Sequence, residues 1–316
     1  MQIKQIDIKT ISNISKSVYL SEAWLSLYDD GLQCYGIYNK GEQLIGGFII
    51  YLEKKVNILN FYRNPTYSPT TNLFFQNKAQ NKSKLLSENK KVLTLFSNFI
   101  QNLKADILSV SLPYTYTDTQ VFFWDNYKVI PNYTYLINLN QDIVTIENNF
   151  STERRNDIKK AIKDNVSVEI SQDFKLIKSL VENTFNRKKK TLDSQFLDKI
   201  LFEFANQDNS YAYISFQNNK AIACSFCIYD KEKVYYILGG YDKDYKHQGA
   251  GALAVSSAIK HAKNMGIKTF DFEGSMLPEV ERYFRGFGGD LTPYYSINKA
   301  KLAIEIGLKF IKRNQF

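Results

Sequence analysis

The chain has 316 residues, of which 44% are hydrophobic and 15% aromatic, and its formal net charge at pH 7 is +9. This length exceeds what one core usually organises, so two domains are expected, and the positive charge indicates anionic partners such as phosphates, nucleic acid or a membrane surface. With 2 histidines and 3 cysteines, a histidine-rich metal site and a disulfide framework are both disfavoured, and no metal is expected. No apolar run approaches the roughly 20 residues that span a bilayer, and no signal-like segment is present, so a cytoplasmic protein with at most peripheral membrane contact is expected.

The first half of the chain is expected to form an antiparallel β meander. The stretch "CYGIYNKGEQ" (34–43) reads as a strand ending in a polar turn, and "LIGGFIIYLEKKVNIL" (44–59) reads as a strand, a charged turn and a second strand. A further strand, "YTYLINL" (133–139), closes this half. The domain boundary is therefore placed near 145–150, which gives domains at 1–148 and 149–316.

The second half repeats this pattern. The stretches "YAYISFQNNK" (211–220) and "AIACSFCIYDKEKVYYIL" (221–238) follow the same order of strands and turns, which indicates an internal duplication. Periodicity and capping signals predict helices at 151–164, 173–186, 194–207, 250–265 and 277–286. They predict strands at 166–170, 211–217, 221–229, 233–240, 268–273 and 293–299, and a basic helix over 300–313.

A glycine-rich loop, "KHQGAGA" (246–252), precedes the helix predicted over 250–265. A P-loop is excluded because no Lys-Ser or Lys-Thr pair follows the glycines. The residues from Gly249 also fit the dinucleotide fingerprint G-x-G-x-x-A, but an antiparallel meander and a polar stretch before the glycines argue against that interpretation. A pyrophosphate loop on a helix N-terminus fits the order of elements better, and a glycine-rich helix start without a ligand is the remaining alternative.

The order strand, K-x-x-G-x-G, helix, strand and a short helix ending in "FRGFGG" (284–289) resembles the GNAT acyltransferase superfamily. The resemblance implies that the loop binds the pyrophosphate of coenzyme A through Lys246, His247, Gln248, Gly249, Ala250, Gly251 and Ala252. Lys246 stands where the family usually has Arg or Gln, which keeps the charge but loses planar bidentate contacts.

A narrower resemblance rests on the tandem layout, the linker "RRNDIKKAIKD" (154–164) and the block "FDFEGSMLPEVERYFRGFGGDLTPYY" (270–295). Together these resemble the FemAB-like branch of the superfamily. This implies an α+β fold of two tandem GNAT-like domains, each a mixed, mostly antiparallel sheet flanked by helices. The first half has "RNPTYSPTTNLFF" (63–75) in place of a glycine loop, so the donor is expected in the second domain alone.

The chemistry of amine acylation suggests which residues act. It requires a base, an amide that meets the carbonyl oxygen and a proton donor. Asp271 and Glu273 share one strand face by alternation and are candidate bases. The resemblance places a catalytic Tyr near Phe284, which makes the adjacent Tyr283 the candidate general acid. It also implies that the strand over Ile237 to Tyr241 splays open and offers a backbone amide to the carbonyl.

The leading hypothesis is an N-acyltransferase that moves an acyl group from acyl-CoA to an amine of a cell-envelope precursor or an amino sugar nucleotide. The acceptor, a small-molecule or carrier-linked amine, is implied by the resemblance alone. Known members of the branch use aminoacyl-tRNA on peptidoglycan precursors, and the lack of a long helical arm here favours acyl-CoA. The alternatives are a FemX-like aminoacyl-tRNA-dependent enzyme with tRNA as partner, a degenerate GNAT-like binding protein and a nucleic-acid-binding protein.

Basic clusters in the linker helix, at 187–190 and at Lys309, Lys312 and Arg313 are interpreted as a solvated surface. The alternative for them is a groove for a phosphorylated acceptor, tRNA or a lipid-carrier surface.

Overall fold

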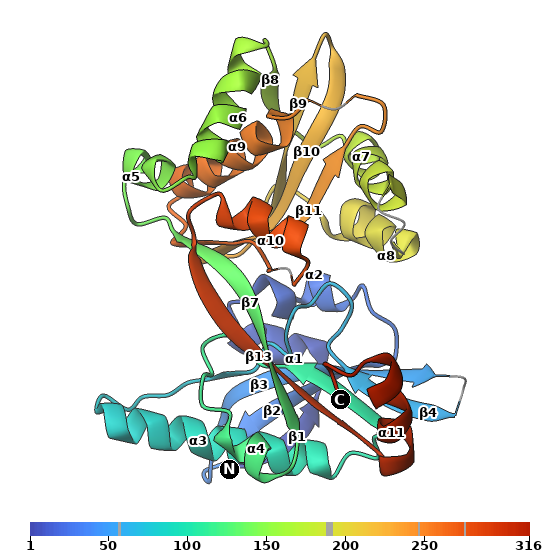
Figure 1. Ribbon diagram of the computed structural model, residues 1–316. Coiled ribbons are helices and arrows are strands. Elements are labelled where there is room, and N and C mark those ends of the chain that lie inside the picture. Colours follow the sequence, from blue (N-terminus) through green and yellow to red (C-terminus); the bar gives the residue numbers. More distant parts are fainter. Residues whose placement is uncertain (56–57, 188–191, 246, 275) are drawn as a thin grey trace. The chain divides into compact units, whose positions relative to one another are not determined.

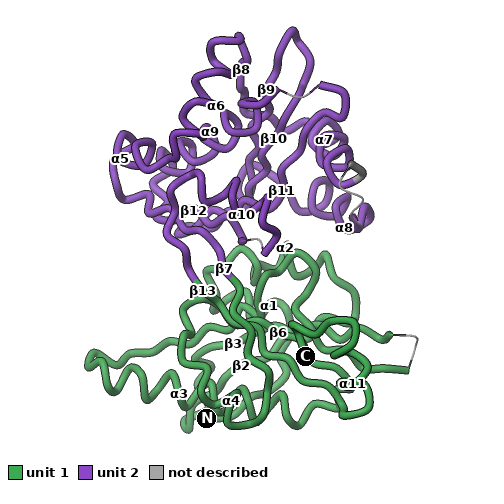
Figure 2. The backbone as a smooth tube through the Cα atoms, in the orientation of Figure 1, with its two compact units in different colours: residues 1–132, 293–316 green, residues 133–292 purple. Residues whose placement is uncertain are grey.

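Figure 1 shows the computed structural model, which describes residues 1–55, 58–187, 192–245, 247–274 and 276–316. The chain divides into two compact units, unit 1 with residues 1–132 and 293–316 and unit 2 with residues 133–292 (Figure 2). The expected boundary between 148 and 149 lies inside unit 2, between α5 (Ile143–Asn148) and α6 (Thr152–Lys163), so the division into domains 1–148 and 149–316 stays a prediction.

Unit 1 is a sheet covered by short helices and one long one. Its elements are β1 (Gln2–Ile6), α1 (Ile8–Ile14), η1 (Val18–Leu20), α2 (Glu22–Leu25), β2 (Leu32–Tyr38), β3 (Leu44–Lys55), β4 (Leu59–Arg63), β5 (Phe74–Phe75), α3 (Lys82–Gln101), β6 (Ile107–Ser111), α4 (Gln120–Trp124) and α11 (Leu302–Ile311). The sheet order is β1–β2–β3–β4–β6–β13, with β4 and β6 parallel. Apolar residues of α3, among them Val92 and Phe96, are fully buried in the core of this unit.

Unit 2 carries the glycine loop. Besides α5 and α6, its elements are β8 (Ser167–Ser171), α7 (Phe174–Arg187), α8 (Ser194–Asp198), η2 (Lys199–Phe204), β9 (Ser210–Gln217), β10 (Lys220–Tyr229), β11 (Lys233–Tyr241), α9 (Ala250–Asn264), β12 (Thr269–Asp271) and α10 (Pro278–Arg285). Two strands, β7 (Lys128–Asn138) and β13 (Asp290–Ala300), have residues in both units.

The two sheets have the same plan, but each takes its last strand from the other half of the sequence. Unit 2 has the order β8–β9–β10–β11–β12–β7, with β11 and β12 parallel. Position by position this matches unit 1, in which β13 closes the sheet beside β6. The topology agrees with the predicted duplication, and it explains why the compact units do not follow a single cut in the sequence.

Helices cover both faces of the unit 2 sheet, with α6 and α9 on one face and α7 and α8 on the other (Figure 1). Alanine and glycine dominate the buried side of α9, so the helix approaches the strands closely. Ser215 Oγ donates to the carbonyl of Ala250 at 2.8 Å, and Ser225 Oγ donates to that of Ala254 at 3.1 Å. These bonds fix the first turns of α9 against β9 and β10.

The predicted elements of the second half are present with small shifts of their ends. The helix expected at 194–207 is divided into α8 and a π-helical turn, η2. The strand expected at 268–273 is shorter because Glu273 (φ 60°) and Gly274 (φ 75°) turn the chain out of the extended conformation just after Asp271. This early turn shapes the site described next.

Candidate active site

An opening lies between the parallel strands β11 and β12. Their pairing runs from Lys233 beside Thr269 to Tyr235 beside Asp271, whereas β11 continues to Tyr241. Beyond Tyr235, therefore, this edge of β11 is not paired with β12. An unpaired strand edge presents backbone N–H and C=O groups that a ligand can bind.

A β-bulge lies in β11 at the start of this opening. Across the β10–β11 pair, Phe226 is opposite Leu238 and Cys227 is opposite Tyr236, so Ile237 is the extra residue. A bulge redirects backbone groups and bends the strand, and bulges are common beside active sites. The structure thus shows an irregularity inside the segment Ile237 to Tyr241, where a carbonyl-binding amide is expected.

A cavity of about 540 Å³ occupies the opening. Its walls come from the bulged strand, the end of β12, α10 and α7. The lining residues are Thr184, Phe185, Tyr236, Ile237, Leu238, Gly239, Tyr241, Phe272, Glu273, Gly274, Leu277, Glu279, Val280, Tyr283 and Phe284. A mainly apolar cavity with a few converging polar groups is the usual form of a small-molecule site.

Glu273, a candidate base, lines this cavity in a left-handed backbone conformation. A φ of 60° is uncommon for a residue other than glycine and is found at functional sites that the surrounding structure holds in place. Here its backbone N–H donates to Oδ1 of Asp271 at 2.9 Å. The carboxylate of Glu273 is thus placed at the cavity wall by a local contact that constrains its backbone.

Asp271, the other candidate base, lies beneath the cavity wall and is not among the lining residues. Its Oδ1 accepts both the N–H of Glu273 and, at 2.6 Å, the hydroxyl of Thr134. Burial raises the pKa of Asp271 above its usual value. The geometry supports a role in positioning Glu273 rather than contact with a substrate.

Tyr283, the candidate general acid, lines the cavity from α10. The guanidinium of Arg154 lies over its ring, 4.7 Å from the centroid. Burial raises the pKa of Tyr283 well above its usual value, and the side chain also interacts with Tyr241. A tyrosine with an ordinary pKa is already protonated at neutral pH, and the raised pKa makes Tyr283 a weaker acid, so its role as proton donor stays a prediction.

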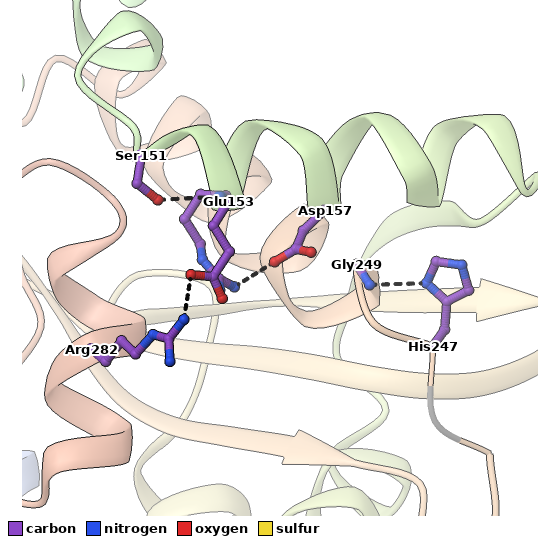
Figure 3. Close-up of polar contacts among 7 residues, drawn as sticks. Ser151, Glu153, Asp157, His247, Gly249 and Arg282 are labelled. Atoms are coloured by element: carbon purple, nitrogen blue, oxygen red, sulfur yellow. Dashed lines mark hydrogen bonds and ion pairs between the residues drawn. The ribbon is translucent and has the colours of Figure 1, made fainter.

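Arg154 is the centre of a polar cluster that joins α6 to α10. Figure 3 shows Glu153 and Asp157 of α6 and Arg282 of α10 in this cluster. Its Nη1 lies 2.9 Å from Oδ2 of Asp157 and its Nη2 lies 3.0 Å from Oε1 of Glu153, which also pairs with Arg282 at 3.1 Å. Arg154 is only 7% exposed. The sequence places Arg154 among the basic residues that are expected to be solvated. The i, i+3 spacing of Arg154 and Asp157 is nevertheless compatible with an ion pair on one helix face.

The glycines of the loop have packing partners within unit 2. A Cβ on Gly249 would lie 1.9 Å from the backbone oxygen of Asp157, and one on Gly251 would lie 1.7 Å from the hydroxyl of Tyr241. The backbone of α6 therefore requires glycine at position 249, whereas a side chain at position 251 would require the Tyr241 ring to shift. Their predicted role in approaching a pyrophosphate stays a prediction.

The other predicted loop residues are arranged around the start of α9. His247 Nε2 lies 3.1 Å from Oδ2 of Asp164, and its Nδ1 accepts the N–H of Gly249 at 3.1 Å. Gln248 is exposed, and its side chain hydrogen-bonds Asp157. Ala250 and Ala252 are buried in α9, and Lys246 lies outside the described residues. The first turn of α9 leaves amide groups at a positive helix end, which suits an anion.

Metal binding and membrane insertion can also be assessed from the described residues. The residues described in the structure contain no group of three or more His, Cys, Asp or Glu side chains that could hold a metal ion. Within the same residues, no helix has the length and apolar character needed to cross a membrane.

Comparison with known proteins identifies the domain that carries this site. Residues 151–285 match the family model described as "Acetyltransferase (GNAT) domain". This range contains the cavity, the glycine loop and the Arg154 cluster. A search among curated proteins found no match.

Solved structures share the fold over nearly the whole chain at low identity. The crystal structure of FemX is similar with a TM-score of 0.68 and 12% identity, covering 97% of this chain and 99% of that one. A C-terminal domain from Agrobacterium fabrum, assigned to a lysylphosphatidylglycerol synthetase, has a TM-score of 0.55 and 9% identity, covering 95% and 94%. A tandem GNAT protein from the clavulanic acid pathway has a TM-score of 0.52 and 7% identity, covering 94% and 97%.

These matches agree with the fold expected from the sequence, a mixed sheet flanked by helices in each of two GNAT-like parts. The match of residues 151–285 to an acetyltransferase domain model supports a transferase. Residues 151–285 therefore match the acetyltransferase (GNAT) domain model, and the chain as a whole has a fold similar to that of FemX.

Proposed function

We propose that the chain is an N-acyltransferase that joins an acyl group to an amine in the opening between β11 and β12. The observation that carries this proposal is that two features line one cavity. These are Glu273 and the bulged strand at Ile237. A base and a carbonyl-binding backbone are the two parts that amine acylation needs first.

In the proposed reaction, the neutral amine nitrogen attacks the carbonyl carbon of the donor. Glu273 accepts a proton from the nitrogen as the new C–N bond forms. The carbonyl oxygen gains negative charge and is stabilised by backbone N–H groups of β11 near the bulge at Ile237. Because these groups are held by the sheet, they require little rearrangement during the reaction.

Collapse of the tetrahedral intermediate breaks the bond to the leaving group, which departs with the electron pair. Tyr283, which lines the same cavity, supplies a proton to the leaving group. Arg154, over the Tyr283 ring, stabilises the phenolate that results. After the reaction Glu273 carries an extra proton and Tyr283 lacks one. Exchange of one proton with solvent at each residue restores the starting state.

The proposed donor is acyl-CoA, because the amide groups at the start of α9 suit its pyrophosphate. Aminoacyl-tRNA is a second candidate, favoured by the packing of Gly249 and Gly251. Since Asp157 and Tyr241 already occupy the space that these glycines leave, close approach of a pyrophosphate would require Tyr241 to move. Both donors present an acyl carbonyl bonded to a good leaving group, so the same residues serve either.

The proposed acceptor is an amine on a cell-envelope precursor or an amino sugar nucleotide. Support comes from the similarity of fold to FemX and to the domain assigned to a lysylphosphatidylglycerol synthetase. A tandem GNAT protein with a similar fold comes from another setting, the clavulanic acid biosynthesis pathway.

The experiment that tests the proposal is calorimetric titration of the full chain with acetyl-CoA and with desulfo-coenzyme A. We expect saturable binding at one site per chain, together with loss of binding when Tyr241→Trp fills the opening. The matched control is Ser111→Ala in unit 1, which should bind like the wild type.

Absence of coenzyme A binding by the folded chain would remove acyl-CoA as donor. A filter-binding assay with charged and uncharged tRNA would then test the second candidate, because an aminoacyl donor requires preference for the charged form. Failure of both assays would contradict the proposed transferase reaction for this cavity.

A further inference from the structure

The helix α11 of unit 1 is mostly apolar, yet none of its residues is buried. Leu302 is 77% exposed, Phe310 is 87% exposed and Ile311 is 82% exposed. Single exposed apolar residues are normal, but a contiguous exposed patch marks a surface that binds something.

The exposed side chains of α11 form a stripe. Leu302, Ile306 and Phe310 follow one another at intervals of four residues, so they share one face of the helix. Ile304 and Leu308 are half-buried, in contrast to the three residues of the stripe. Neighbours on unit 1 therefore account for one side of the helix and leave the stripe to solvent.

Positive charge lies beside the stripe. Lys309, Lys312 and Arg313 are exposed at its end, whereas Lys301 at its start is paired with Asp106 at 2.6 Å. Lys312 and Arg313 make no ion pair with any residue that the structure describes. Glu305, the acidic residue of α11, is paired with Lys309 at 2.7 Å. An apolar stripe bordered by cations complements a surface that is apolar within and anionic at its edge.

Aromatic side chains of α4 extend this surface. A groove of about 530 Å³ in unit 1 is lined by Phe123 together with Lys309 and Glu305 of α11. Phe123 is 73% exposed, and the adjacent Trp124 is also exposed. Large aromatic residues of this kind are favoured at the boundary between lipid headgroups and acyl chains.

We infer that α11, with the neighbouring aromatic residues of α4, is a docking surface for an anionic lipid bilayer. At 1.5 Å per residue a helix of 10 residues is about 15 Å long, which is too short to span a bilayer and fits an interfacial position. A second copy of the chain is a poorer occupant, because a two-fold contact through this stripe would bring like-charged lysines and arginines together.

Vesicle sedimentation with the full chain tests this inference. We expect binding to vesicles that contain phosphatidylglycerol, weak binding to pure phosphatidylcholine vesicles, and weakening of the former at high salt. The double variant Phe310→Ser/Ile311→Ser should reduce binding at least about tenfold, because it removes apolar surface from the lipid contact. Lys312→Glu/Arg313→Glu should reduce it to a similar extent.

Matched controls distinguish binding through this surface from non-specific apolar or electrostatic binding to vesicles. Ile58→Ser removes an apolar side chain that is also 77% exposed in unit 1, and Lys159→Glu/Lys160→Glu makes the same charge change on α6. Both controls should retain most of the binding. Far-UV circular dichroism and urea unfolding would show that every variant folds.

Three results would overturn the inference. One is equal binding to neutral and anionic vesicles, and another is equal loss of binding in the α6 control and the α11 variants. The third is a concentration-dependent dimer that Phe310→Ser/Ile311→Ser converts to monomer while vesicle binding is unchanged. None of these readouts depends on donor binding or acyl transfer, so the proposed function can fail without affecting this test.

Discussion

The two units share one strand plan, but they use the space beyond their parallel strand pair differently. In unit 2, β11 runs on past its last pairing, Tyr235 with Asp271, and the cavity lies along the remaining edge. In unit 1, β4 ends at Arg63, whose partner on β6 is Ser109. The pairing of β3 with β4 is continuous, whereas β11 is bulged at Ile237.

The loop at 64–75 accounts for the difference. Thr71 donates its N–H to the carbonyl of Ser111 at 2.8 Å and accepts the N–H of Ile49 at the same distance. Asn64 Oδ1 accepts the N–H of Ser111 at 3.0 Å. In unit 1, this loop hydrogen-bonds backbone groups of β3 and β6 beyond the end of β4. In unit 2, the corresponding part of β11 lines a cavity. The two units thus differ in whether the chain itself fills the space beyond the parallel strand pair.

The largest expected effect is on catalysis. The parallel pairing ends at Asp271 in unit 2 and at Ser109 in unit 1. Glu273 and Ser111 each lie two residues further along the chain, so they occupy equivalent positions. Glu273→Gln should lower kcat by about 10²–10⁴-fold, because loss of a general base typically costs this much. The measurement is a single-turnover assay with the donor identified by titration. Ser111→Ala should leave kcat unchanged, and equal activity of both variants would refute the contrast between the units.

The second effect concerns the cluster that fixes α6 beside the opening of unit 2. Arg154→Met leaves the buried carboxylate of Asp157 without its partner, which should lower the free energy of unfolding by about 3–5 kcal/mol. Urea unfolding measures this loss. The double variant Arg154→Met/Asp157→Leu should recover most of it, since neither charge then remains. A double variant as unstable as the single one would contradict the pairing.

A smaller effect is expected from filling a glycine of the loop. Gly251→Ala places a methyl group where the Tyr241 hydroxyl lies, so it should destabilise the fold by about 1–3 kcal/mol through overpacking. The matched control in unit 1 is Gly307→Ala on α11, where no atom lies within 4 Å of the added Cβ. That control should stabilise the fold by up to about 1 kcal/mol, because alanine is favoured over glycine in a helix. Thermal unfolding of both variants measures the two effects. A shift of Tm in the same direction for both would contradict the prediction.

The smallest effect separates a positioning role from a catalytic one at Asp271. Asn has an oxygen in the same place and can accept from Thr134 and from the N–H of Glu273, so Asp271→Asn should keep kcat within a few-fold. Asp271→Ala should destabilise the fold by about 1–3 kcal/mol, since two buried donors lose their acceptor. A loss of kcat in the Asn variant as large as in Glu273→Gln would make Asp271 the base instead.

The burial of Asp271 also predicts a pH dependence of the free energy of unfolding. Burial raises the folded-state pKa of Asp271 above its usual value of 3.8, so the folded state binds the proton more tightly than the unfolded one. The stability contributed by this residue is therefore greatest below pH 3.8 and falls as the pH rises towards the folded-state pKa. Asp271→Asn should remove this slope from the urea-unfolding free energy measured across that range.

Local pattern was sufficient to predict much of unit 2. Alternation predicted β9, β10 and β11, and the small residues of "GAGALAV" (249–255) predicted the start of α9, because strands and helices differ in the period of their apolar residues. The end of a predicted strand made Glu273 a candidate, and the family resemblance made Tyr283 one. Both residues line one cavity, and their catalytic roles stay predictions.

The tertiary structure decided what local pattern does not contain. The exchange of β7 and β13 between the units is a long-range pairing, so the boundary expected near residue 148 could not reveal it. Arg154 appeared as one more surface cation until packing placed it over Tyr283. The roles of Gly249 and Gly251 likewise depend on Asp157 and Tyr241, which approach them only in the folded chain. Sequence periodicity determines which elements form, whereas contacts between distant residues decide which strand edge is open and which charge is buried.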